Sequence, residues 1–115
     1  MFQKISMSDL NAKLKTLSAK EIILDVRSSE EYLDGHVPGS TNIPYDEVEG
    51  HFEDLKKLER VYIHCQAGKR AQIAAQTLVQ KGLKNLVCVS QGGMGEWIEA
   101  GFPVEKGKSY SYNPK

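Results

Sequence analysis

Three short runs of apolar residues, separated by segments with helical spacing, constrain most strongly what this chain can fold into. The runs lie within residues 21–27, 61–64 and 86–90, and each contains branched residues that favour strands. A continuous apolar run is typical of a strand that is buried on both faces of a parallel sheet. We therefore predict β-α-β units in an α/β domain, with a central, mainly parallel sheet flanked by helices.

Capping residues and apolar spacing predict where the helices lie. Ser6 or Ser8 can cap a first helix, and Ser28 or Ser29 can cap a short second one. Residues 36–44 contain two prolines and a Pro-Gly pair, so they form a loop with at most a short strand. Further helices are predicted at residues 45–58, at about 70–81 and at about 96–100.

Length, charge and cysteine content exclude several classes of protein. The 115 residues fit one domain, which we place at residues 1–105, with a polar C-terminal tail at 106–115. Fifteen basic and fifteen acidic residues balance, which argues against nucleic acid or an acidic membrane surface as a partner. No apolar run is long enough to span a membrane, and no export signal is evident at the start. Two cysteines without metal-ligand spacing suit a reducing cytoplasm and predict neither a metal site nor another cofactor.

The cysteine at the end of the second apolar run has an unusual setting. Cys65 follows a predicted strand, and an Ala-rich helical segment begins five residues later. Gly68 gives the connecting loop backbone freedom, and the loop amides lead into a helix N-terminus, where partial positive charge collects. Lys69 and Arg70 add formal positive charge. A buried, inert cysteine is the commoner reading of such a position, but this loop favours a nucleophile beside an anion site.

Three stretches, in order along the chain, resemble the rhodanese-like domain family. The first combines Asp-Val-Arg at residues 25–27, Glu-Tyr at 31–32, the Gly-His-Val-Pro-Gly-Ser segment at 35–40 and Asn-Ile-Pro at 42–44. The second is Cys-Gln-Ala-Gly-Lys-Arg at residues 65–70, which is similar to the active-site loop of that family. The third combines Gly-Gly-Met at 92–94 with Gly-Phe-Pro-Val at 101–104. The resemblance implies a three-layer domain around a sheet of five strands.

By the same resemblance, the chain is a single-domain thiosulfate sulfurtransferase. Cys65 would take the sulfane sulfur of thiosulfate, or of a related persulfide donor, as a persulfide and pass it to a thiol or to cyanide. The charges of Lys69 and Arg70 lead us to favour anionic thiosulfate over mercaptopyruvate. The predicted catalytic residue is Cys65, and the predicted substrate-binding residues are Gln66, Ala67, Gly68, Lys69 and Arg70.

Two alternatives remain open at this point. The domain could be a persulfide carrier or protein-binding module that serves a partner enzyme in a sulfur relay. It could also be a cysteine-dependent phosphatase or arsenate reductase, because those enzymes use a related loop followed by a helix. Their loops place five residues between the cysteine and an arginine, whereas four residues separate Cys65 from Arg70, and Ala71 stands where that arginine would fall.

Several other polar or aromatic residues are expected to have structural roles. Asp25 and Arg27 share one face of a strand and can pair to brace a loop. His64 should point away from the side of its neighbour Cys65 and not act as its base. We expect Cys88, at the centre of an apolar run, to be inert. Trp97 fits either the core or the mouth of a pocket.

Overall fold

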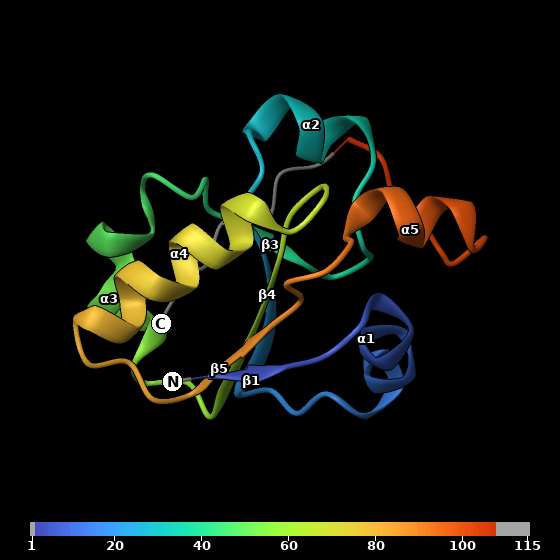
Figure 1. The fold of residues 1–115 in the computed structure, drawn as a ribbon. Coiled ribbons are helices and arrows are strands. Elements are labelled where there is room, and N and C mark those ends of the chain that lie inside the picture. Colours follow the sequence, from blue (N-terminus) through green and yellow to red (C-terminus); the bar gives the residue numbers. More distant parts are fainter. Residues whose placement is uncertain (1, 108–115) are drawn as a thin grey trace.

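A five-stranded, all-parallel sheet forms the centre of the computed structural model, which describes residues 2–107 (Figure 1). The strands are arranged in the order β1-β5-β4-β2-β3. The predicted α/β fold is confirmed, whereas most of the tail predicted at residues 106–115 lies outside the described residues. The strands are β1 (Gln3–Lys4), β2 (Glu21–Asp25), β3 (Thr41–Asn42), β4 (Arg60–His64) and β5 (Leu86–Cys88).

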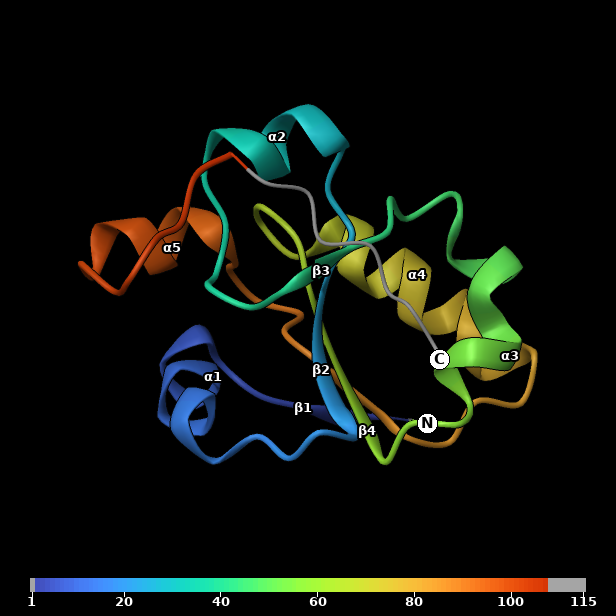
Figure 2. The same ribbon diagram turned by 180° about the vertical axis from the view of Figure 1, so that it is seen from behind.

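Helices cover both faces of this sheet and give the domain three layers (Figures 1 and 2). α3 and α4 lie on one face, α1 and α5 lie on the other, and α2 lies near the carboxyl ends of β2 and β4. The helical elements are α1 (Met7–Lys13), η1 (Leu14–Thr16), α2 (Ser29–Asp34), η2 (Val48–His51), α3 (Phe52–Leu55), α4 (Lys69–Gln80) and α5 (Met94–Glu99).

The apolar runs supply side chains to both layers of helices. Side chains alternate along a strand, so one run fills two cores. Leu24 and Ile63 join the core beneath α4, together with Ala71 and Leu78 of that helix. The opposite core lies under α1 and α5 and includes Met7, Leu10, Ile23, Tyr62, Val87, Met94 and Trp97. Burial of the strands on both faces is therefore confirmed.

The helix starts follow the capping residues. Ser6 caps α1 and Ser28 caps α2, and each forms a reciprocal capping box with an acidic side chain three residues later. The prediction of a helix over residues 45–58 is wrong at both ends, because only residues 48–55 are helical and the first half of these is a 3₁₀ turn. Tyr45 donates its N–H to the carbonyl of Val26 at 2.9 Å, which holds the start of the segment against the end of β2 instead of releasing it into a helix.

Candidate active site

Cys65 lies at the carboxyl end of the middle strand of the sheet. β4 ends at His64, Cys65 follows directly, and α4 begins at Lys69, so the connecting loop is residues 65–68. The loop lies near α2 and near the start of α5 (Figure 2). Ligands of open α/β sheets bind at the carboxyl ends of the strands. Only 1% of the Cys65 surface is exposed, so the sulfur is enclosed by its own loop.

Backbone amides hold the sulfur atom of Cys65. Its Sγ accepts hydrogen bonds from the N–H of Gly68 at 3.0 Å and from the N–H of Ala71 at 3.3 Å. Gly68 is the N-cap of α4 and Ala71 lies in its first turn, where the helix dipole is positive. Within residues 2–107, the N–H groups of Gln66 and Ala67 donate to no protein acceptor. The loop is therefore equipped to stabilise negative charge on sulfur.

Two glycines allow the loop to pack tightly against the chain that leads into α5. Gly68 has a φ of +115°, and a Cβ at this position would lie 2.3 Å from the carbonyl oxygen of Ser90. A Cβ at Gly93 would lie 2.1 Å from the carbonyl oxygen of Cys65. That carbonyl accepts the N–H of Met94 at 2.8 Å. The start of α5 thus fixes the position of the backbone of Cys65.

The two cationic residues that follow the loop, at the start of α4, are placed differently. Lys69 is exposed, and no ion pair of its side chain occurs among the described residues. Arg70 donates from both terminal nitrogens to both carboxylate oxygens of Glu31, at 2.7 and 2.9 Å. These hydrogen bonds lower the pKa of Glu31 from 4.5 to about 2, against the opposing effect of partial burial. Glu31 therefore balances the charge of Arg70.

A buried ion pair lies behind the loop. Asp25 is fully buried, and Arg27 donates to its carboxylate from Nε at 3.1 Å and from Nη2 at 2.8 Å. The same guanidinium donates to the carbonyl of Gly35 at 2.7 Å and to Oε1 of Gln66 at 3.4 Å. The predicted pairing is present, and it links the end of α2 to the side chain of the first loop residue after Cys65.

His64 is fully buried beneath the loop and contacts the backbone of Cys65, not its sulfur. Nδ1 lies 3.3 Å from the carbonyl oxygen of Cys65, and Nε2 lies 3.9 Å from Oδ2 of Asp25. Burial lowers the pKa of this histidine, because the charged form loses its hydration. The geometry agrees with the expectation that His64 is not the base for the thiol.

His36, Trp97 and Cys88 are buried and lie in structural settings. His36 is buried, its Nδ1 lies 2.7 Å from the carbonyl oxygen of Tyr32, and its ring stacks on that of Tyr32. Trp97 is a core residue and donates its indole N–H to the carbonyl of Pro103 at 2.6 Å. Burial raises the pKa of Cys88 to about 11, which keeps this thiol protonated at neutral pH.

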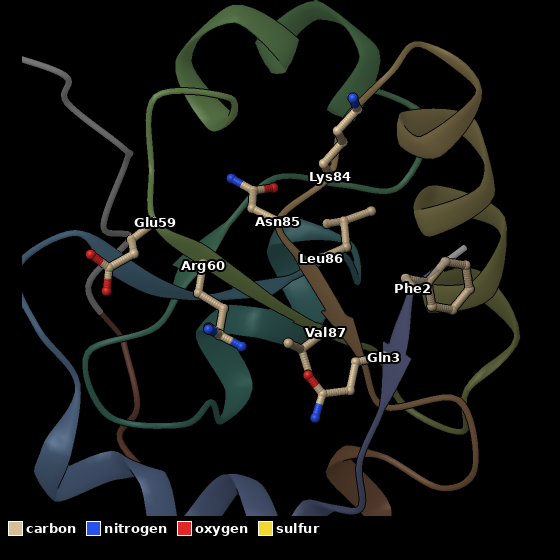
Figure 3. A pocket seen from close by; sticks show the side chains of 8 residues that line it. All are labelled: Phe2, Gln3, Glu59, Arg60, Lys84, Asn85, Leu86 and Val87. Atoms are coloured by element: carbon tan, nitrogen blue, oxygen red, sulfur yellow. The ribbon is translucent and has the colours of Figure 1, made fainter.

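A separate hollow lies at the amino ends of the strands, opposite the Cys65 loop (Figure 3). Because the strands are parallel, their amino ends lie together, away from the Cys65 loop. The hollow is formed where β1, β4 and β5 begin, and it does not belong to the cysteine site. Its lining residues are Phe2, Gln3, Glu59, Arg60, Lys84, Asn85, Leu86 and Val87.

The described residues hold neither a candidate membrane span nor a candidate metal cluster. Across residues 2–107, no helix has the length and apolar character needed to cross a membrane. In the same range, no three His, Cys, Asp or Glu side chains are grouped so that they could hold a metal ion.

Sequence reasoning missed two residues that shape the site. Glu31 lies 39 residues before Arg70. It had two signals in the sequence, the capping box with Ser28 and a place in the first stretch that resembles the family, and neither indicated a contact with Arg70. Gly93 belongs to a glycine pair that predicted a turn, but the pattern did not indicate its approach to Cys65.

Comparisons with known proteins agree with this fold. The rhodanese-like domain family matches residues 6–100. The "Putative sulfur carrier protein YrkF" of Bacillus subtilis is 41% identical over 75 residues, which are 65% of this chain and 40% of that protein. A crystal structure of a rhodanese-related protein from Thermoplasma volcanium has a TM-score of 0.77 at 34% identity, covering 90% of this chain and 98% of that one. The thiosulfate sulfurtransferase of Pseudomonas aeruginosa has a TM-score of 0.83 at 26% identity, covering 97% of this chain and 22% of that one.

The chain belongs to the rhodanese-like domain family. It spans 40% of the length of YrkF and 23% of the adenylyltransferase and sulfurtransferase UBA4 of Meyerozyma guilliermondii, to which it is 28% identical. Its relatives therefore include proteins named as sulfur carriers and as sulfurtransferases, and they carry this domain within longer chains.

Proposed function

We propose that this protein transfers sulfane sulfur through a persulfide on Cys65. The observation that carries the proposal is the position of Sγ, held by the amides of Gly68 and Ala71 at the N-terminus of α4. Such an environment stabilises a thiolate before the reaction and a persulfide anion after it. The donor we propose is thiosulfate or a related persulfide, and the acceptor is a thiol or cyanide.

Sulfur transfer onto the enzyme is a displacement at sulfur. The Cys65 thiolate attacks the outer sulfur of thiosulfate, a new S–S bond forms, and the S–S bond of the donor breaks with its electron pair leaving on sulfite. The products are the persulfide anion of Cys65 and the sulfite dianion, so charge and electrons balance. The free N–H groups of Gln66 and Ala67 are suited to hold the outer sulfur of the persulfide.

Transfer to the acceptor repeats the displacement. Cyanide attacks the outer sulfur of the Cys65 persulfide, and the electron pair of the broken S–S bond returns to Sγ, which gives thiocyanate and the Cys65 thiolate. A thiolate acceptor gives a new persulfide in the same way. No oxidant or reductant is consumed in either step.

A persulfide carrier that loads once and delivers to a partner protein is the second candidate. It is favoured by the enclosure of Cys65, which is 1% exposed, and by the name of the relative YrkF as a sulfur carrier. In that case, the partner would belong to a sulfur relay. A cytoplasmic location is part of the proposal and rests on the cysteine content alone.

A phosphatase is the weaker alternative because of the arginine geometry. Bidentate binding of phosphate needs a free guanidinium, and both terminal nitrogens of Arg70 are occupied by Glu31. At the next position, Ala71 offers only its amide, which already binds Sγ.

The test is intact-mass measurement after exposure to thiosulfate. We expect the mass of one added sulfur atom, removed by a thiol reductant, and continuous thiocyanate formation when thiosulfate and cyanide are both supplied. Sulfur loading with negligible turnover would favour the carrier. Hydrolysis of an aryl phosphate that depends on Cys65, without persulfide formation, would overturn the proposal.

Gly93→Ala is expected to lower the rate of thiocyanate formation at least about tenfold. The added Cβ would lie 2.1 Å from the carbonyl oxygen of Cys65, so the loop and its nucleophile must shift, and a displacement of about 1 Å can cost about 100-fold in rate. Gly50→Ala is the matched control, because a Cβ there meets nothing within 4 Å. Equal rates in the two variants would contradict this account of the loop.

A further inference from the structure

Glu31 takes part both in the cap of α2 and in an ion pair with Arg70 of α4. Oε1 of Glu31 accepts hydrogen bonds from the N–H and the hydroxyl of Ser28, both at 3.1 Å, as part of the cap of α2. The two carboxylate oxygens also accept hydrogen bonds from the two terminal nitrogens of Arg70 in α4. The carboxylate is therefore held in place by its own helix, independently of Arg70, and offers the guanidinium a fixed anionic partner.

Little uncompensated positive charge remains around the loop. Arg27, which contacts Gln66, is paired with Asp25, and Arg70 is paired with Glu31. Within residues 2–107, no ion pair is found for Lys69, the cation that directly follows the loop. A dianion that binds both terminal nitrogens of Arg70 must displace Glu31, and it then lies close to the displaced carboxylate.

We propose that Glu31 is a specificity-determining residue that competes with dianionic donors for Arg70, so that the site favours sulfur carried on a thiol over thiosulfate. This inference rests on the proposed function. A persulfide donor, R–S–SH, transfers its outer sulfur to the Cys65 thiolate, and the electron pair of the broken S–S bond leaves on R–S⁻. The donor brings no sulfonate-like group that requires Arg70, so the Glu31 pair can stay intact.

The experiment compares two donors with one acceptor. Glu31→Gln and the wild type are assayed for thiocyanate formation from thiosulfate and from glutathione persulfide. Glutamine keeps the capping box, so α2 should be preserved while the charge is removed. We expect kcat/KM for thiosulfate to rise about fivefold, as for loss of an exposed ion pair, and kcat/KM for glutathione persulfide to change less than about twofold. Glu30→Gln is the matched control, because Glu30 is exposed on the same helix and has no ion pair with a described residue.

Two further readouts separate this role from a structural one. Added salt should reduce kcat/KM for thiosulfate more steeply in Glu31→Gln, where the charge of Arg70 is unpaired. The pKa of Glu31 is lowered from 4.5 to about 2 by Arg70, so its stabilising contribution is present above pH 4.5 and is lost as the pH falls toward 2. Glu31→Gln should lack this acid-dependent loss. Because the Glu31 side chain is 36% exposed, the difference should be small.

The possible outcomes are distinct. An unchanged ratio of thiosulfate to glutathione persulfide activity in Glu31→Gln, with both reactions dependent on Cys65, would overturn the inference and leave the proposed function standing. Identical acid unfolding of the wild type and Glu31→Gln would also overturn it, because the pair would then be absent in solution. If neither donor gives sulfur to Cys65, the proposed function fails, and the inference fails with it.

Discussion

Cys65→Ser is expected to reduce thiocyanate formation by at least about 1,000-fold, to the rate without protein, while the fold is retained. A serine oxygen cannot form the persulfide, and its hydroxyl is far harder to ionise than a thiol. The measurement is steady-state thiocyanate formation, together with intact mass after thiosulfate, in which the variant should gain no sulfur. A circular dichroism spectrum and a melting curve close to those of the wild type would show that the loss is chemical.

Cys88→Ser is the matched control for this experiment. Cys88 is fully buried in β5, and burial raises its pKa to about 11, so we expect the variant to keep its activity within about twofold of the wild type. Because a buried hydroxyl can destabilise a core, Cys88→Ala serves as a second control without a polar group. Loss of sulfur loading in a folded Cys88 variant would require a relay between the two thiols.

Asp25→Leu and Arg27→Leu are each expected to lower the free energy of unfolding by about 3–5 kcal/mol. The carboxylate of Asp25 is fully buried and Arg27 is 4% exposed, so either single change leaves an unpaired charge in the interior. Urea unfolding, followed by circular dichroism at neutral pH, measures the loss. Sulfur transfer should also fall, because the pair supports Gly35 and Gln66 beside the loop.

A double variant with leucine at both Asp25 and Arg27 tests whether an unpaired buried charge causes the loss of stability. With both charges removed, no charge remains unpaired, so its loss of stability should be clearly smaller than the sum of the single losses. The exposed pair of Lys56 and Glu53 is the control, and leucine at either position should change stability by less than about 1 kcal/mol. Additive losses at Asp25 and Arg27 would mean that their pairing is not the source of the effect.

Elements with local signals could be predicted from the amino-acid sequence. Continuous apolar runs predicted strands buried on both faces, because every side chain of such a strand faces a core and is therefore apolar. Ser6 and Ser28 marked the helix starts, because a cap is made within one turn. The place of Cys65 at a strand end before a helix followed from the same local patterns. The family was recognised separately, from three sequence motifs that resemble those of rhodanese-like domains.

Contacts between distant residues could not be predicted, because they depend on how the elements pack. The two-residue strand β1 was missed, because so short an edge strand has no period to detect and exists through its pairing with β5. Gly93 approaches Cys65 only when α5 packs beside the loop, and Arg70 meets a carboxylate 39 residues away only when α2 and α4 come together at one end of the sheet. Local patterns specify how each segment is buried, whereas the pairing of charges around the sulfur depends on how the segments pack. For that reason the sequence predicted Cys65 and its loop as the site, and only the fold showed that Glu31 forms an ion pair with Arg70.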